Sequence, residues 1–271
     1  MPELPEVETV LMGLRPQLTG ARLAGAEVRE PRLRWPVPAD LDERLRGQRI
    51  RELRRRGKYL LVELEARTLI LHLGMSGSLR LVGAGSTPGP HDHLDLLLAD
   101  GRRLRLTDPR RFGSVLLADE PEHHPLIARL GIEPLSAAFD GAYLYRLCRG
   151  RRTAIKHLLM DARLIAGVGN IYANEALFRA GIDPRTPAGR LGQARCARLV
   201  AALHETLREA IAAGGSTLRD FVDGHGRAGY FQLKCAVYGR AGQPCPRCGG
   251  RIVRLVQGGR SSYLCPRCQR S

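Results

Sequence analysis

Apolar residues near the start of the chain recur every three or four positions, which is the spacing of one face of an α-helix. They are Leu4, Val7, Val10, Leu11, Leu14 and Leu18. The pattern predicts an amphipathic helix over residues 4–18, packed by its apolar face against the chain that follows.

Between about residues 22 and 118 the pattern changes to short runs of apolar and alternating residues separated by turns, which is typical of strands. The predicted strands are Arg49–Leu53, Tyr59–Leu64, Thr68–Leu73, Leu79–Val82, Leu94–Leu98, Arg103–Thr107 and Val115–Ala118. Asp100-Gly101 is a hairpin-turn signal between two of them. A β-sandwich is the economical arrangement for strands of this number and length.

From about residue 122 onward the helical spacing returns. Helices are predicted near 126–130, 142–149, 153–160, 170–180 and 192–213. The chain is therefore expected to be α+β with two domains: an N-terminal helix and sandwich over 1–130, a hinge at 131–141, a helical domain over 142–234 and a cysteine module over 235–271. Residues 216–232 hold three glycines and few apolar anchors, which favours a mobile loop.

The charge balance narrows the class of partner. The 271 residues carry a formal net charge of +16 with a pI near 10.4, which favours a polyanionic partner, nucleic acid first. No run approaches the roughly 20 apolar residues of a membrane helix, and the N-terminus lacks a secretory apolar region. We expect a soluble intracellular protein that does not bind membranes.

Pro2 and Glu3 are candidates for covalent chemistry. If Met1 is removed, Pro2 becomes a secondary amine, which attacks an aldehyde-like carbon to give an iminium ion and so favours breaking bonds one carbon away. Glu3 is then the nearest group to move protons. Pro5 suits the first turn of a helix, and Glu6 faces the positive end of the helix dipole, where it would orient the site. The alternative is an ordinary helix start.

Four of the seven cysteines form two Cys-x-x-Cys pairs separated by sixteen residues: Cys245, Cys248, Cys265 and Cys268. Four thiolates make a closed tetrahedral shell, which predicts one structural Zn²⁺ per chain and no organic cofactor. An iron–sulfur cluster or a redox pair is the alternative. Between the pairs a β-hairpin is predicted with Arg260 at its tip, where a fixed guanidinium suits a phosphate.

Several motifs together resemble the formamidopyrimidine-DNA glycosylases over almost the whole chain. They are Met-Pro-Glu-Leu-Pro-Glu-Val-Glu-Thr at the start, Arg-Gly-Lys-Tyr-Leu around Lys58, His-Leu-Gly-Met-Ser-Gly-Ser from His72, Thr-Asp-Pro-Arg-Arg-Phe-Gly from Thr107, and Gly-Val-Gly-Asn before Asn170. Glycines ahead of a helix let backbone donors face an anion, and Asn170 falls on the family's phosphate-binding asparagine in a helix–two-turn–helix motif.

The resemblance implies a role for each matched residue. Pro2, Glu3, Lys58 and Arg260 are the expected catalytic residues, Glu6 supports them, and Lys58 contacts the phosphate beside the lesion. A base that is excised must leave the stack, so Met75 and Phe112 are expected to fill the gap and Arg110 to bind the orphaned cytosine. Asn170 and Arg152 are further DNA-binding candidates. Thr217 and Arg219 lie on the loop expected to close over the lesion.

His91-Asp92-His93 could hold a metal, because alternate strand residues share a face, but no third ligand is evident. Related enzymes carry a similar triplet without a metal, which implies that His91 lies near a DNA phosphate.

The expected function is excision of oxidised purines, 8-oxoguanine and formamidopyrimidines, from double-stranded DNA by a bifunctional glycosylase and AP lyase. Abasic sites are also expected substrates. Two alternatives stay open: an endonuclease VIII-like enzyme for oxidised pyrimidines, and a non-catalytic zinc protein that binds damaged DNA. A monomer in the bacterial cytoplasm, associated with the nucleoid, is implied by the resemblance.

Overall fold

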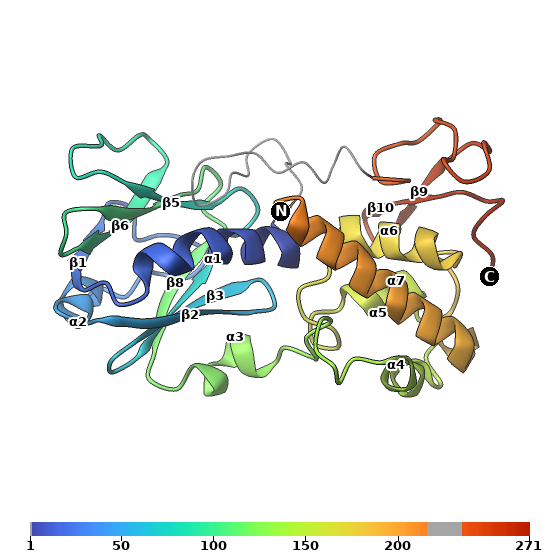
Figure 1. The fold of residues 1–271 in the computed structure, drawn as a ribbon, viewed down its shortest axis with the longest axis horizontal. Helices are drawn as coiled ribbons and strands as arrows, with labels where there is room; N and C mark the ends of the chain where they lie inside the picture. The colour runs from blue at the N-terminus through green and yellow to red at the C-terminus, as the bar shows by residue number, and fades with distance from the viewer. Residues whose placement is uncertain (1, 216–234) are drawn as a thin grey trace. The chain divides into compact units, whose positions relative to one another are not determined.

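The spacing of apolar residues at the start of the chain produces helix α1 (Leu4–Leu18), as predicted. Its apolar residues are buried in the core of the first part of the chain. The computed structural model describes residues 2–215 and 235–271 (Figure 1). The predicted mobile loop, with Thr217 and Arg219, lies outside these residues.

After α1 the chain forms a β-sandwich of two four-stranded antiparallel sheets. One sheet runs β1 (Leu23–Val28), β6 (Asp92–Leu98), β7 (Arg103–Thr107), β5 (Ser78–Val82). The other runs β2 (Ile50–Arg56), β3 (Tyr59–Leu64), β4 (Thr68–His72), β8 (Ser114–Ala118). A single apolar cluster joins α1 to strands of both sheets, so the helix and the sandwich share one core.

The seven predicted strands are confirmed, with ends that differ by about three residues at most. Strand β1 and the short helix α2 (Leu41–Leu45) were missed. Strand β1 contains Gly25 at φ +144°, and its register with β6 shifts between Leu23 and Gly25. Small residues and a bulge give little alternation, which explains why the pattern did not predict this strand.

The short helices η1 (Pro121–His123) and α3 (Pro125–Ala128) end the first part of the chain. The second part contains α4 (Gly141–Cys148), α5 (Ile155–Met160), α6 (Asn170–Ala180), η2 (Ala188–Arg190) and α7 (Gln193–Ala212). Helix α7 packs against both α4 and α6. A hairpin of β9 (Val253–Gln257) and β10 (Arg260–Leu264) packs against α6. The α+β class with a helical part and a cysteine-bearing hairpin is confirmed.

The buried carboxylate of Glu175 in α6 fixes the segment that follows residue 234. It accepts hydrogen bonds from the backbone N–H groups of Ala236, Val237 and Tyr238 at 2.8, 3.0 and 2.8 Å. Three N–H donors satisfy the hydrogen-bonding capacity of a buried carboxylate, which would otherwise be costly to bury. The C-terminal module is thereby attached to the helical part at a defined point.

The described residues separate into two compact units, the first formed by 2–128 and 213–215 and the second by 129–212 and 235–271. The hinge at 131–141 stays a prediction. Among the described residues, no helix is long and apolar enough to cross a membrane.

Candidate active site

The first turn of α1 carries the residues predicted to perform the chemistry. Glu3 is the N-cap in an extended conformation and forms a capping box with Glu6. The Glu3 backbone N–H donates to Glu6 Oε2 at 2.7 Å, and the Glu3 side chain accepts from the Glu6 backbone. Pro2, Glu3 and Glu6 are buried. The carboxylates therefore lie next to Pro2 in fixed orientations at the positive end of the helix dipole.

Lys58 lies at the turn between β2 and β3, where Gly57 has φ +57°. Arg55 holds this turn: its Nε donates to Glu8 Oε2 of α1 at 2.6 Å, and its Nη1 donates to the Gly57 carbonyl at 2.9 Å. Helix α1, which begins two residues after Pro2, thus fixes the turn that carries Lys58. Sequence reasoning did not predict that Glu8 and Arg55 pair, because they are 47 residues apart.

His72, at the end of β4, is held neutral beside this turn. Burial, together with the positive charges of Lys58 and Arg34, lowers the pKa of His72 to about 4. Its ring lies 4.7 Å from that of Tyr59, and its Nδ1 accepts from the Gly74 N–H at 3.0 Å. The neutral ring adds no positive charge beside Lys58 and orders the loop that leads to Met75.

Met75 and Phe112 are each 40% exposed, which is unusual for large apolar side chains in a chain with a well-filled core. They lie on different loops, after β4 and before β8. The Arg110 guanidinium lies 4.9 Å from the centre of the Phe112 ring. The exposed positions of Met75, Phe112 and Arg110 allow contact with a ligand, although their individual roles stay predictions.

His91 is exposed, whereas His93 is buried and its Nε2 lies 2.8 Å from the Asp108 carbonyl oxygen. Asp92 is also buried and pairs with Arg105. The two histidines therefore have different environments and do not form a shared ligand set. Within residues 2–215 and 235–271, the four cysteines are the only group of three or more metal-ligating side chains found together.

The second unit brings Asn170 and the Arg260 hairpin together. Asn170 is the first residue of α6, and its Nδ2 donates to the carbonyl of Ser261, next to Arg260, at 3.1 Å. Buried Lys156 donates to the same carbonyl at 2.8 Å and to Ser262 Oγ at 2.7 Å. Lys156 was not predicted as a site residue, and only its burial and contacts reveal that it holds the hairpin in place.

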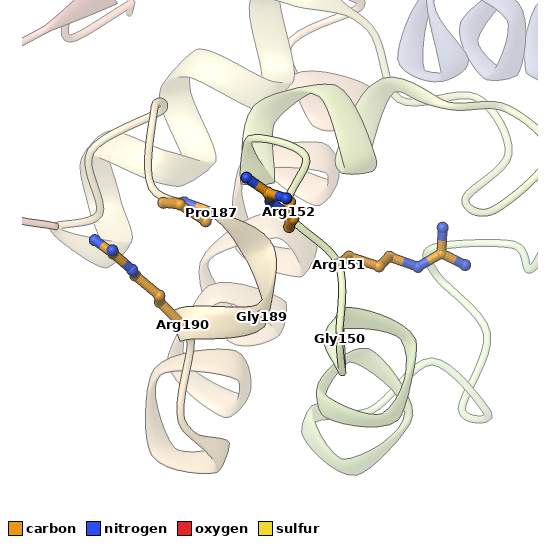
Figure 2. A pocket seen from close by; sticks show the side chains of 6 residues that line it. All are labelled: Gly150, Arg151, Arg152, Pro187, Gly189 and Arg190. Atoms are coloured by element: carbon orange, nitrogen blue, oxygen red, sulfur yellow. The ribbon is translucent and has the colours of Figure 1, made fainter.

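Arg152 borders a pocket of about 480 Å³ in the second unit (Figure 2). The lining residues are Gly150, Arg151, Arg152, Pro187, Gly189 and Arg190. The Gly189 N–H donates to the Arg151 carbonyl at 2.9 Å, which joins the two segments that form the pocket. The Arg151 side chain extends away from Arg190 and donates to the Leu147 carbonyl. Arg152 and Arg190 give the pocket a positive rim suited to an anion. Arg190 was not predicted.

The four cysteine sulfurs lie within 4.8 Å of one another. The Cys245 and Cys268 sulfurs are 3.8 Å apart, and those of Cys248 and Cys265 are 3.5 Å apart. A Zn–S bond of about 2.3 Å gives a tetrahedral edge of about 3.8 Å, so the cluster fits one Zn²⁺. Hydrogen bonds with the Gly250 backbone and with the neighbouring cysteines lower the pKa of the Cys248 thiol to about 7, whereas burial raises the pKa of Cys265 and raises that of Cys268 to about 12. The fit to a metal therefore rests on the sulfur positions.

The β-sandwich with buried Pro2 and Glu3, the helices and the four-cysteine hairpin together define a zinc-finger protein with a strongly basic composition and a candidate enzyme site. Three family models match the chain in succession. They are the formamidopyrimidine-DNA glycosylase N-terminal domain over residues 1–115, the H2TH domain of the same glycosylase over 130–222, and the zinc finger found in FPG and IleRS over 242–270.

Curated relatives match over the full length. The formamidopyrimidine-DNA glycosylase of Alkalilimnicola ehrlichii is 59% identical and that of Thiobacillus denitrificans 57% identical, each with 100% of both chains covered. The crystal structure of MutM (FPG) from Thermus thermophilus is 44% identical at a TM-score of 0.87, covering 99% of this chain and 98% of that one. The Lactococcus lactis FPG mutant G226P in complex with Fapy-dG DNA has a TM-score of 0.92 at 34% identity, with full coverage of both chains.

The chain belongs to the formamidopyrimidine-DNA glycosylase family. The predicted resemblance and the predicted structural zinc are therefore confirmed, and the iron–sulfur alternative is wrong. The full-length relatives above are glycosylases of this name, which excludes the non-catalytic zinc protein and favours the purine branch over the endonuclease VIII-like alternative.

Proposed function

We propose that this enzyme, a DNA glycosylase and AP lyase that excises oxidised purines in base excision repair, acts through the amine of Pro2. The observation that carries the proposal is the burial of Pro2 beside Glu3 and Glu6, whose orientations the capping box fixes. The proposal requires removal of Met1, because Pro2 is a secondary amine only when it is the first residue. After that removal, an amine beside carboxylates is poised to attack and to exchange protons.

The Pro2 nitrogen attacks C1′ of the damaged nucleotide, and the bond from C1′ to the base breaks as the base leaves with its electron pair. The N–H proton of the attacking amine neutralises the departing base, which leaves a neutral nitrogen on C1′. Glu3 protonates the sugar ring oxygen, so that the ring opens to an iminium ion. The iminium acidifies C2′, and loss of a C2′ proton expels the 3′ phosphate by β-elimination. A second elimination expels the 5′ phosphate, and water releases Pro2. Lys58 and Arg260 neutralise the phosphates on which charge develops.

The remaining residues are proposed to hold the DNA. Lys58, His91, Arg152, Asn170 and Arg260 contact phosphates. Met75 and Phe112 fill the space that the flipped base leaves, and Arg110 binds the cytosine opposite the lesion. Lys58 and Asn170 are partly exposed and the other six side chains are exposed, which together with the positive charge of the chain supports the proposal.

Related structures support the substrate class. Lactococcus lactis FPG has been solved with DNA that contains Fapy-dG, an abasic site or an oxidised pyrimidine. We infer that double-stranded DNA with oxidised bases or abasic sites is the substrate of this chain. The proposal also includes a monomeric state and a location in the bacterial cytoplasm at the nucleoid. It further includes a hinge at 131–141 and closure of the loop bearing Thr217 and Arg219.

Trapping of the covalent intermediate tests the nucleophile. The protein is incubated with an 8-oxoguanine duplex or an abasic duplex in the presence of borohydride, which reduces an iminium to a stable amine. Mass mapping is expected to place the DNA on Pro2. An adduct on any other residue, or the absence of an adduct from a protein whose N-terminus is shown to be Pro2, would exclude Pro2 as the nucleophile.

A further inference from the structure

The residues proposed to replace the flipped base come from two loops. Met75 lies on the loop after β4, whereas Arg110 and Phe112 lie between β7 and β8. Exposed side chains on separate loops would be poorly positioned if each loop moved alone. The structure therefore needs a group that fixes the two loops to each other.

Asp108, the residue after β7, is such a group. It is fully buried, at 0% exposure. Its Oδ1 accepts from the Ser76 hydroxyl at 3.0 Å, and its Oδ2 accepts from the Gly113 N–H at 2.7 Å. Ser76 directly follows Met75, and Gly113 directly follows Phe112. One carboxylate thus spans both loops.

The backbone of Asp108 extends this connection. Its N–H donates to the His91 carbonyl at 2.9 Å, and its carbonyl accepts from the Arg111 N–H at 3.1 Å and lies 2.8 Å from His93 Nε2. Arg111 has φ +55° and is the one non-glycine residue with positive φ among the described parts of the chain. The backbone of Asp108 therefore binds both His91 and the turn that contains Arg110 and Arg111.

The two loops also touch directly. A Cβ at Gly74, where φ is +59°, would lie 2.4 Å from the carbonyl carbon of Phe112. A Cβ at Gly113 would lie 2.9 Å from the His72 carbonyl oxygen and 3.0 Å from Asp108 Oδ2. Backbones in such close contact cannot shift independently. The loops behave as one body around Asp108.

We propose that Asp108 is a positioning residue for lesion recognition, which couples the Met75 loop to the Arg110–Phe112 loop so that both engage the DNA as a single unit. The inference rests on the proposed DNA-facing roles of those side chains. Asp108 itself is buried and touches no substrate.

The hydrogen bonds of the Asp108 carboxylate predict which Asp108 variant retains more function. A carboxylate accepts from both Ser76 and Gly113, and alanine accepts from neither. Asparagine keeps one oxygen for the Gly113 N–H and can donate its amide to Ser76 Oγ, because the hydroxyl can rotate and accept. The same amide faces the Arg110 N–H, which donates to Asp108 Oδ1 at 3.3 Å, so that bond is lost. Asp108→Asn should therefore retain part of the function that Asp108→Ala loses.

The test compares two substrates under single-turnover conditions: an 8-oxoguanine duplex, whose base must be extruded, and a preformed abasic duplex, which has no base to extrude. Asp108→Ala should lower the rates on both duplexes by different factors, and the factor for 8-oxoguanine should be at least about ten times the factor for the abasic duplex. It should also reduce the preference for cytosine over adenine opposite the lesion. Ser76→Ala should change both quantities in the same direction by a smaller factor.

Asp95→Asn is the matched control. Asp95 is equally buried in the same sandwich but pairs with Arg105 and Arg29. Asp95→Asn should lower the rates on the two duplexes by the same factor and leave the preference for cytosine over adenine opposite the lesion unchanged. If Asp108→Ala behaves like this control, or retains its rate on 8-oxoguanine, the positioning role is wrong. Failure of the unmodified enzyme to cut either duplex would instead contradict the proposed function.

Discussion

Arg55 Nε donates to Glu8 Oε2 at 2.6 Å and so joins strand β2 to helix α1. The Arg55 side chain is 9% exposed and that of Glu8 is 23% exposed, so the pair is largely shielded from water. Arg55 also bonds the Gly57 carbonyl, one residue before Lys58. The pair joins helix α1, which directly follows Pro2 and Glu3, to the turn that carries Lys58 within the first unit.

Glu8→Gln is expected to lower the excision rate about tenfold, because loss of a shielded charge pair costs about 1–3 kcal/mol and loosens Lys58. Single-turnover kinetics on an 8-oxoguanine duplex measure this. Asp40→Asn is the control, since the Asp40–Arg44 pair is exposed and worth little. Equal rates for Glu8→Gln and the unmodified enzyme would contradict the role assigned to the pair.

Glu3→Gln should slow base excision by about 10²-fold or more, because the amide cannot transfer the proton that general acid catalysis requires. The amide oxygen can still accept from the Glu6 backbone, so the helix cap and DNA affinity should persist. Excision rates and equilibrium binding to the same duplex separate the two effects. Near-normal turnover would remove Glu3 from the mechanism.

His72 makes a defined contribution to the pH dependence of stability. Its folded pKa of about 4 lies below the ordinary value of 6.5. Between these values the unfolded chain binds a proton that the folded chain rejects, so stability falls as pH falls from 6.5 toward 4. The loss is at most about 3 kcal/mol.

Denaturant unfolding of the unmodified protein and of His72→Asn at pH 7 and pH 4 measures this loss. Asparagine can still accept from the Gly74 N–H but does not titrate. The variant should therefore lose less free energy of unfolding over this interval than the unmodified protein. Parallel losses in the two proteins would show that His72 does not drive the change.

Arg152→Ala and Asn170→Ala should each weaken DNA binding. Loss of the Arg152 contact should lower the slope of log K against log salt concentration by about one unit, and loss of the neutral Asn170 amide should lower it by less. Arg163→Ala is the matched control, because Arg163 in the same unit is exposed and paired with Asp161. An unchanged slope for Arg152→Ala would argue against a phosphate at the pocket of Figure 2.

Metal analysis should find one Zn²⁺ per chain, and Cys268→Ala should lose both the zinc and most of the DNA affinity, because the site holds the Arg260 hairpin in shape. Cys196→Ala, at a buried thiol outside the cluster, should keep both. Iron in place of zinc would defeat the metal assignment.

Local sequence patterns predicted the features that depend only on residues close together in the sequence. Helices α1 and α6 were predicted with their observed bounds, since apolar spacing and a helix-start signal specify each. The four cysteines were predicted because metal ligands have characteristic spacings. Strand β1 was missed, as glycine and alanine give it no clear alternation.

The supporting contacts could not be predicted, because they join residues far apart in sequence. The partners Lys156 and Ser262 are separated by 106 residues, and Asp108 and Ser76 by 32. A buried lysine or aspartate has no local pattern that distinguishes it from a solvated charge. Only the folded chain shows which donors each one meets.

The Glu175 anchor recognises peptide groups and no side chains. Its three partners are main-chain N–H groups, so this contact itself constrains no side chain at 236–238, whereas the apolar cluster around the fully buried Val237 constrains that residue. Proline is excluded at all three positions, because it has no N–H to offer. The entry to the zinc-bearing end is thus held through its main chain by an acidic residue and through Val237 by apolar packing.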